Sequence, residues 1–213
     1  NVDAHLHALA EQESSAQQHY MDNARKLSKA RRSAAKTLSQ QVQKQLTALG
    51  MKAAQLDARL SECSPTPDGL EEVEFLFSAN PGQPLKPLGK VASGGELSRV
   101  SLAIQVICAR NLTVPSLVFD EVDVGVGGGV AEIVGRLLRE LGQHAQVLCI
   151  THQPQVASQG HQHWQVHKIQ EDETTHTRIQ ELDDAARVEE LARMLGGVEI
   201  TESTRNHAKE MLS

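Results

Sequence analysis

Aromatic residues are scarce in this sequence. They make up 2% of its 213 residues, although hydrophobic residues reach 39%. The core must therefore be built from Leu, Val, Ile and Ala, a composition that is usual for α/β and helical proteins and that disfavours an all-β sandwich. The length allows one globular core with an appendage, since domains commonly hold about 100 to 150 residues.

Cysteines are few and lack the spacing of a metal site. Cys63, Cys108 and Cys149 lie far apart in apolar surroundings, and no CxxC pair occurs. This pattern argues against zinc and disulfide bonds and favours buried thiols in a reducing cytoplasm. A run of about 18 apolar residues is also missing, and residues 1–7 do not form a basic and apolar leader. We expect a soluble, cytoplasmic protein with no membrane partner, present here as a segment of a longer chain.

The net charge of -6 argues against a protein that coats its whole surface with nucleic acid, because phosphate binding needs locally concentrated Lys and Arg. A local basic run does occur within residues 25–36. Its members are Arg25, Lys26, Lys29, Arg31, Arg32 and Lys36. Two interpretations stay open: the run follows a DNA phosphate backbone, or it is a solvated helix face balanced by acids on a partner.

Residues 1–49 contain no Pro or Gly and are rich in Ala, Gln and Lys, which predicts one long helix. Val2, Leu9 and Ala16 repeat every seven residues, as in a coiled coil. Gly50 follows as a helix C-cap would. We therefore expect a coiled-coil arm at 1–49 and a separate domain at 50–213.

Periodicity in the second region alternates between strands and helices, which indicates a parallel α/β core. The predicted strands are 54–61, 73–77, 116–120 and 146–151, with two further β-prone runs at 164–169 and 177–182. The predicted helices are 94–110, 129–142, 185–195 and 201–212.

The segment from Ser93 to Arg99 reads SGGELSR and carries a helix start. Ser93 followed three residues later by Glu96 matches a capping box. Gly94 and Gly95 let a ligand approach the backbone, and the positive end of a helix favours phosphate. An ordinary capped helix explains the same residues equally well.

Two apolar strands are each followed by polar side chains suited to phosphate chemistry. The strand at 116–120 ends in Asp120 and Glu121, and the strand at 146–151 is followed by His152. Parallel strands bring their carboxyl ends to one edge of a sheet, where α/β proteins bind ligands. There one carboxylate can hold Mg²⁺, its neighbour can activate water, and the imidazole can contact a transferred phosphate.

Together these residues resemble the signature motif, Walker B strand and H-loop histidine of ABC-type ATPases, in the same order. The stretches VASGGELSR, LVFDEVDVGVGG and ITHQPQVA are similar to the RecN family of SMC-like bacterial proteins, from about residue 45 to the C-terminus. The resemblance implies the C-terminal lobe of an ABC-type P-loop ATPase head with a coiled-coil helix. It also implies a role in repair and recombination at DNA double-strand breaks, and association with the nucleoid.

The resemblance further assigns roles to single residues. It implies a homodimer that sandwiches ATP between two heads, so that the signature of one head reaches the γ-phosphate held by the other. Asp120 is then the Mg²⁺ ligand, Glu121 the general base, and His152 the group that stabilises the γ-phosphate. The signature residues implied to contact ATP are Ser93, Gly94, Gly95 and Glu96.

Two positions depart from the transporter pattern, and one motif is missing. Ala92 stands where ABC transporters usually carry Leu, which favours the SMC branch, and Gly127 stands where the D-loop aspartate would fall. No G-x-x-x-x-G-K-[ST] occurs in the chain. We therefore expect the chain alone to be inactive and to need the N-terminal Walker A half of the same protein.

Two other functions fit parts of the sequence. One is a DNA-tethering scaffold in which ATP turnover is incidental. The other is the nucleotide-binding subunit of a membrane transporter, which the heptad arm argues against.

Overall fold

The computed structural model describes residues 2–90, 93–109, 114–171, 174–196 and 200–213. It divides into two compact units. The first holds Asn1–Lys44 and Ala53–Lys90, and the second holds Gln45–Lys52 and Val91–Ser213. The division into an arm at 1–49 and a head segment at 50–213 stays a prediction about the parent protein.

The predicted long helix is present as α1 (Val2–Ala48). It ends where Gly50 adopts a φ of 80°, and the Met51 N–H returns to the Leu46 carbonyl at 2.8 Å. This left-handed C-terminal turn needs a residue without a Cβ, so the predicted cap at Gly50 is confirmed.

The first apolar residues of the predicted coiled-coil repeat are exposed to solvent in this chain. Val2 is 74% exposed and Leu6 is 58% exposed. No helix in the described ranges is long and apolar enough to cross a membrane.

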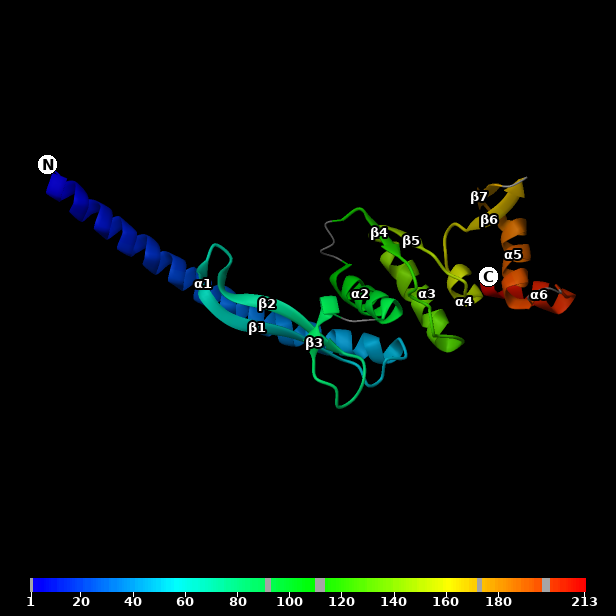
Figure 1. Cartoon of the computed structure of the whole chain (residues 1–213), viewed down its shortest axis with the longest axis horizontal. Helices are drawn as coiled ribbons and strands as arrows, with labels where there is room; N and C mark the ends of the chain where they lie inside the picture. The colour runs from blue at the N-terminus through cyan, green and yellow to red at the C-terminus, as the bar shows by residue number, and fades with distance from the viewer. Residues whose placement is uncertain (1, 91–92, 110–113, 172–173, 197–199) are drawn as a thin grey trace. The chain divides into compact units, whose positions relative to one another are not determined.

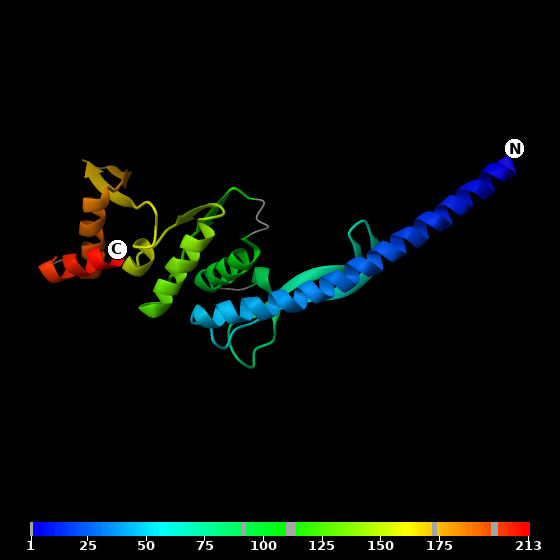
Figure 2. The ribbon, with the colours of Figure 1, turned by 180° about the vertical axis from the view of Figure 1, so that it is seen from behind.

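Three strands form an antiparallel sheet in the first unit: β1 (Gln55–Thr66), β2 (Gly69–Ser78) and β3 (Lys86–Pro87), followed by the short 3₁₀ helix η1 (Leu88–Lys90). Strands predicted at 54–61 and 73–77 are confirmed within β1 and β2. Both views of the ribbon show the hairpin lying along the middle of α1 (Figure 1, Figure 2).

Polar contacts hold the hairpin against the helix along its length. The Tyr20 hydroxyl donates to the Gly69 carbonyl at 3.1 Å, near the hairpin turn. Arg31 donates to the Asp68 carbonyl at 2.7 Å, and Gln43 donates to the Ala54 carbonyl at 2.6 Å at the other end. A strand pair therefore covers part of α1.

The second unit alternates strands and helices as the periodicity predicted. Its elements are α2 (Gly94–Cys108), β4 (Ser116–Phe119), α3 (Gly129–Leu141), β5 (Gln146–Cys149), α4 (Pro154–Ala157), β6 (Trp164–Glu171), β7 (Thr174–Glu181), α5 (Asp184–Gly196) and α6 (Glu202–Leu212). Residues 110–113, the first of which was assigned to a helix, lie outside the described residues.

The two strands that carry the phosphate motifs are neighbours. β4 and β5 pair in parallel, with Ser116 opposite Gln146 and Phe119 opposite Cys149. The predicted parallel pairing is confirmed. β6 and β7 form a separate antiparallel hairpin.

The core between the motif-bearing elements is aliphatic, as the shortage of aromatics requires. Leu102 of α2, Val122 after β4, and Val134 of α3 are fully buried. A second cluster joins α4, α5 and α6 through Ala157, Leu191 and Ala208. The first group holds α2 and α3 against the segment that follows β4.

The prediction of buried cysteines was wrong. Cys63, Cys108 and Cys149 are free thiols that are only half-buried. For Cys149 the apolar neighbours in β5 do not ensure full burial, because successive side chains of a strand point to opposite faces.

Candidate functional site

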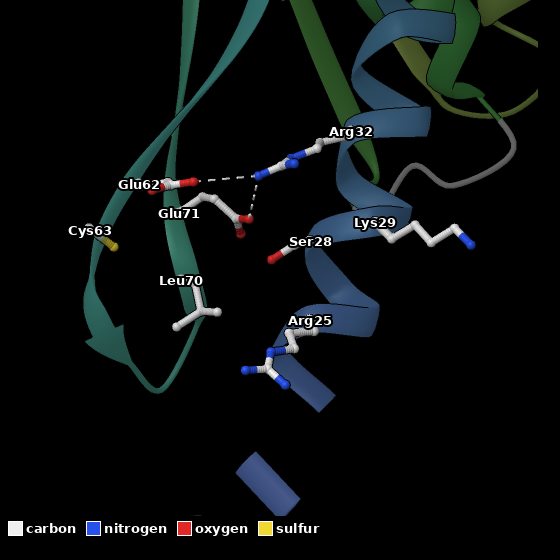
Figure 3. Close-up of a pocket in the computed structure, with 8 residues that line it drawn as sticks. All are labelled: Arg25, Ser28, Lys29, Arg32, Glu62, Cys63, Leu70 and Glu71. Atoms are coloured by element: carbon white, nitrogen blue, oxygen red, sulfur yellow. Dashed lines mark ion pairs between the residues drawn. The ribbon is translucent and has the colours of Figure 1, made fainter. Parts of the chain in front are cut away.

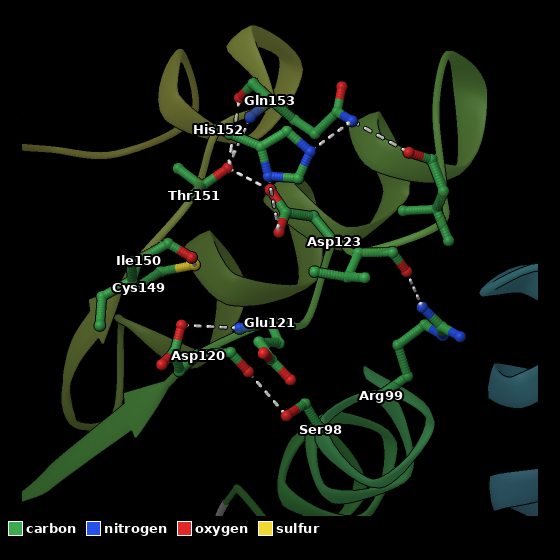
Figure 4. A network of polar contacts seen from close by, with 12 residues as sticks. Ser98, Arg99, Asp120, Glu121, Asp123, Cys149, Ile150, Thr151, His152 and Gln153 are labelled. Carbon is green, nitrogen blue, oxygen red and sulfur yellow. Dashed lines mark hydrogen bonds and ion pairs between the residues drawn. The ribbon is translucent and has the colours of Figure 1, made fainter. Parts of the chain in front are cut away.

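The site residues gather at the carboxyl edge of the β4–β5 sheet. Asp120 and Glu121 directly follow β4, and Thr151 and His152 follow β5. The Ile150 N–H bonds the Phe119 carbonyl at 3.0 Å and extends the parallel pairing past the strand ends. The two predicted polar groups therefore leave the sheet side by side (Figure 4).

The glycine-containing helix start lies against the same edge. Ser93 is the N-cap of α2, and its side chain accepts a hydrogen bond from the Glu96 N–H at 3.4 Å. This bond is one of the two that a capping box contains, and it fixes where α2 begins. The neighbouring Ala92 lies outside the described residues.

Both signature glycines lie close to Glu121 at the β4 edge. A Cβ added at Gly94 would overlap the carboxylate of Glu121, and one added at Gly95 would lie 3.2 Å from the Glu121 carbonyl oxygen. The Ser98 hydroxyl donates to the Asp120 carbonyl at 2.7 Å. The first turn of α2 is therefore packed on the backbone of the acidic pair.

Arg99 anchors the other side of this helix. It is 9% exposed, and its guanidinium donates to the Val124 carbonyl at 2.8 Å. Burial lowers the pKa of Arg99 below its ordinary value, and the nearby Glu96 opposes that shift. The residue holds α2 to the loop that follows β4.

The backbone at Glu121 is strained. Its φ is +58°, a left-handed conformation that L residues seldom adopt. The Asp120 carboxylate accepts the Glu121 N–H at 2.9 Å, and the Val124 N–H closes a turn onto the Glu121 carbonyl at 3.2 Å. Strain of this kind persists where surrounding contacts enforce it, and it concentrates at functional sites.

A buried acid to which the sequence analysis assigned no role lies beside His152. Asp123 is 1% exposed, and its Oδ2 accepts a hydrogen bond from the Thr151 hydroxyl. Its Oδ1 lies 3.8 Å from Nδ1 of His152. In the described part of the chain the polar contacts of His152 run to Asp123 and Gln153, and not to Asp120 or Glu121.

Asp123 left a weak signal in the sequence. It lies two residues beyond the Asp120 and Glu121 pair, between Val122 and Val124, and these apolar neighbours predict that it is buried. The cost of burying a carboxylate then calls for a partner. Periodicity does not say which residue that partner is.

The carboxylates also act on the thiol of β5. Burial raises the pKa of Cys149 to about 12, and the charges of Asp123 and Asp120 add to the shift. The edge of the sheet is thus a region of negative potential.

A magnesium ion fits this donor set only together with a nucleotide. Among the described residues no cluster of three or more His, Cys, Asp or Glu side chains could hold a metal ion. Mg²⁺ commonly takes one or two carboxylates and completes its shell with phosphate and water. Asp120 at the strand end suits that arrangement.

The basic run of α1 borders an open groove of about 500 Å³ in the first unit (Figure 3). Arg32 lies 3.8 Å from Glu62 and 3.9 Å from the buried Glu71, and Arg31 also lies 3.9 Å from Glu71. The groove is lined by Arg25, Ser28, Lys29, Arg32, Glu62, Cys63, Leu70 and Glu71. Two of the six basic residues are therefore balanced by acids of the hairpin in the same chain.

Comparisons with known proteins give relatives over the whole length of the chain. It is 49% identical over 215 residues to the DNA repair protein RecN of Xylella fastidiosa, with 100% of this chain and 39% of that protein covered. For the protein of the same name from Vibrio cholerae the identity is 49% over 212 residues, covering 99% and 38%. For that of Bacillus subtilis it is 40% over 228 residues, covering 100% and 40%. The chain thus spans about two fifths of the length of these curated relatives.

A solved structure shares the fold. The Smc head domain with a coiled coil and joint from Pyrococcus yayanosii superposes with a TM-score of 0.56 at 20% identity, covering 85% of this chain and 33% of that one. No family model matches the chain. The expected fold, an α/β lobe of an SMC-type head with a long N-terminal helix, is confirmed.

Proposed function

The chain belongs to the RecN family, and from that premise we propose that it is the C-terminal part of an ATPase head in a protein that repairs DNA double-strand breaks. In the complete protein, ATP bound between two heads drives their closure, and hydrolysis reopens them. The name of the relatives, DNA repair protein RecN, and the fold shared with an Smc head support this reading.

One observation carries the proposal: three separate motifs converge at one sheet edge. The start of α2, the acidic pair after β4, and His152 after β5 come from distant parts of the sequence. Two of them are in direct contact, since Gly94 lies against Glu121. A chance helix cap does not require such a neighbour.

We assign the chemistry to two side chains. Glu121 orients the attacking water and accepts its proton, and His152 donates a hydrogen bond to the γ-phosphate. Phosphoryl transfer depends on positioning and on neutralising charge. The enforced backbone at Glu121 supports its part in this, because it fixes the direction in which the side chain leaves the backbone.

Nucleotide and metal binding follow the same logic. Ser93, Gly94, Gly95 and Glu96 present the first turn of α2, whose N-terminal N–H groups and positive dipole suit the γ-phosphate of ATP held by the opposite head of a homodimer. Asp120 is the Mg²⁺ ligand. When bound, the ion neutralises charge on the phosphates.

The N-terminal half of the same protein is the first partner. The chain has no Walker A motif, and β4 and β5 expose an apolar face: Val118 is 66% exposed, Leu148 52% and Ile150 60%. A face of this kind in a parallel sheet is normally covered on both sides. We propose that the Walker A half covers it, and that the chain alone does not turn over ATP.

DNA is the second partner, bound by the complete protein at breaks, which places the protein in the cytoplasm with the nucleoid. The charge pattern supports a limited contribution from α1. Arg25 and Lys29 also border the groove, and among the described residues neither makes an ion pair like those of Arg32 with Glu62 and Glu71.

The test is ATP turnover by the full-length protein, with Glu121→Gln and Ser93→Arg compared with wild type. Loss of the general base should lower kcat by about 10²-fold or more, and an Arg at the signature should block the trans contact. Glu132→Gln, an exposed acid of α3, is the matched control and should leave turnover unchanged.

Other outcomes have distinct meanings. Turnover that survives both changes would reject the assignment of the site. Turnover abolished by Glu121→Gln with unchanged bridging of DNA ends would favour the scaffold function, in which hydrolysis is incidental.

A further inference from the structure

We infer that Asp123 is a positioning residue that holds the imidazole of His152 for contact with a phosphate. The inference rests on the proposed function, because it concerns the same site. It is carried by a chain of polar contacts that begins at a backbone carbonyl and ends at a buried carboxylate (Figure 4).

The first part of the chain fixes the tautomer of His152. The Val126 carbonyl can only accept a hydrogen bond, so the Gln153 group that faces it at 3.1 Å is the amide nitrogen. The same nitrogen lies 3.2 Å from Nε2 of His152. Because an amide nitrogen only donates, Nε2 accepts, and the ring proton of a neutral His152 is on Nδ1.

The second part supplies the acceptor for that proton. Nδ1 points to Oδ1 of Asp123 at 3.8 Å, and this oxygen is buried without a hydrogen-bond partner in the described structure. A buried carboxylate oxygen left unpaired is costly. A small rotation of the exposed imidazole would close the gap, and such bonds are commonly long before ligand binds.

The third part keeps the carboxylate in place. The Thr151 hydroxyl donates to Oδ2 of Asp123, and the Gln153 N–H donates to the Thr151 oxygen at 2.9 Å. Asp123 is 1% exposed, whereas the side chain of His152 is 65% exposed. A fixed acid thus stands behind a ring that is open to solvent.

The two nitrogens of the His152 ring therefore have different partners. Nδ1 faces Asp123, so Nε2 is the ring atom that contacts phosphate. In the chain without nucleotide, Gln153 occupies Nε2, so a phosphate oxygen must replace it. A phosphate oxygen only accepts hydrogen bonds, so this contact needs a proton on Nε2 as well as on Nδ1.

A double-mutant cycle on the full-length protein tests this role. The variants are Asp123→Asn, His152→Ala and the pair together, with kcat and KM for ATP as readouts. Asp123→Asn keeps the size of the side chain but places an amide by the ring. We expect kcat to fall by about 10²-fold with KM changed less than about threefold. In the His152→Ala background the same change should cost nothing further.

The cycle separates positioning from structure. If Asp123 only stabilised the fold, Asp123→Asn would slow turnover by the same factor with or without His152, and the inference would be overturned. A wild-type kcat in Asp123→Asn would also overturn it. Asp68→Asn, an exposed acid at the hairpin turn, is the control and should leave both constants unchanged.

Thr151→Val keeps the measurement informative if Asp123→Asn does not fold. It preserves every charge and removes only the hydroxyl that donates to Asp123. We expect a fall in kcat of about tenfold, again absent in the His152→Ala background, and an unchanged kcat would count against the inference.

Should Glu121→Gln keep full turnover, the proposed function itself fails. Loss of turnover in Glu121→Gln and His152→Ala, but not in Asp123→Asn, rejects the inference alone.

Discussion

The left-handed backbone at Glu121 predicts an inverted preference between glycine and alanine. Glu121→Gly and Glu121→Ala both remove the carboxylate and differ only in the Cβ. At a φ of +58° an L residue costs about 1–2 kcal/mol, while glycine loses about 0.5–1 kcal/mol more conformational entropy on folding. The glycine variant should therefore be the more stable by about 0.5–1 kcal/mol.

A helical site gives the matched control. Arg136 is exposed in the middle of α3, where alanine is favoured over glycine by about 1 kcal/mol. Arg136→Gly should thus be less stable than Arg136→Ala, the reverse of the order at Glu121.

Urea unfolding of the 213-residue chain measures both pairs. With an m value of about 2–3 kcal/mol/M, the midpoints at position 121 should differ by about 0.3 M in favour of glycine. If alanine were the more stable residue at both positions, Glu121 would not be held in the left-handed region. The argument that its backbone conformation positions the side chain would then fail. In the full-length protein both Glu121 variants should lack turnover.

Three further changes test other parts of the structure. Leu102→Ala should destabilise the chain by about 2–5 kcal/mol because the side chain is fully buried. Leu97 is 38% exposed, so Leu97→Ala should cost less than about 1 kcal/mol. Urea unfolding compares the two variants. The pKa of Cys149 is raised to about 12, so its alkylation rate should keep rising about tenfold per pH unit up to pH ~10. A thiol with a pKa of about 8.5 has levelled off by that pH. A rate that levels off near pH 9 would contradict the effect of burial and nearby charge on this thiol. Glu190→Gln replaces one of the two carboxylate oxygens that accept from Arg193 at 2.8 and 2.7 Å with an amide nitrogen, so one of the paired bonds is lost. It should lower the unfolding free energy by about 1–3 kcal/mol, and a negligible loss would show that the pair is not formed.

Local signals in the sequence identified the elements that carry the site. A stretch without Pro or Gly predicted α1, and a serine cap predicted the start of α2. Short apolar runs predicted β4 and β5. Each of these depends on residues close together in the chain, such as a cap and the N–H groups that it serves, and so can be recognised without knowing the fold.

Long-range contacts decided what the sequence left open. Whether Arg31 and Arg32 face DNA or a protein acid depended on where the β1–β2 hairpin packs, and it lies along α1 with Glu71 between them. The exposure of the cysteines likewise depended on which strand face is covered.

The sequence by itself determined the motifs, their order, and their placement at the ends of two parallel strands. Only the tertiary structure showed that Glu121 has a left-handed backbone and a carboxylate that lies against Gly94, and that Asp123 and Gln153 face the two nitrogens of His152. The physical reason is that hydrophobic periodicity encodes which side of an element is buried, but not which residue from another element it meets. That choice is made by packing and by the need of each buried polar atom for a partner.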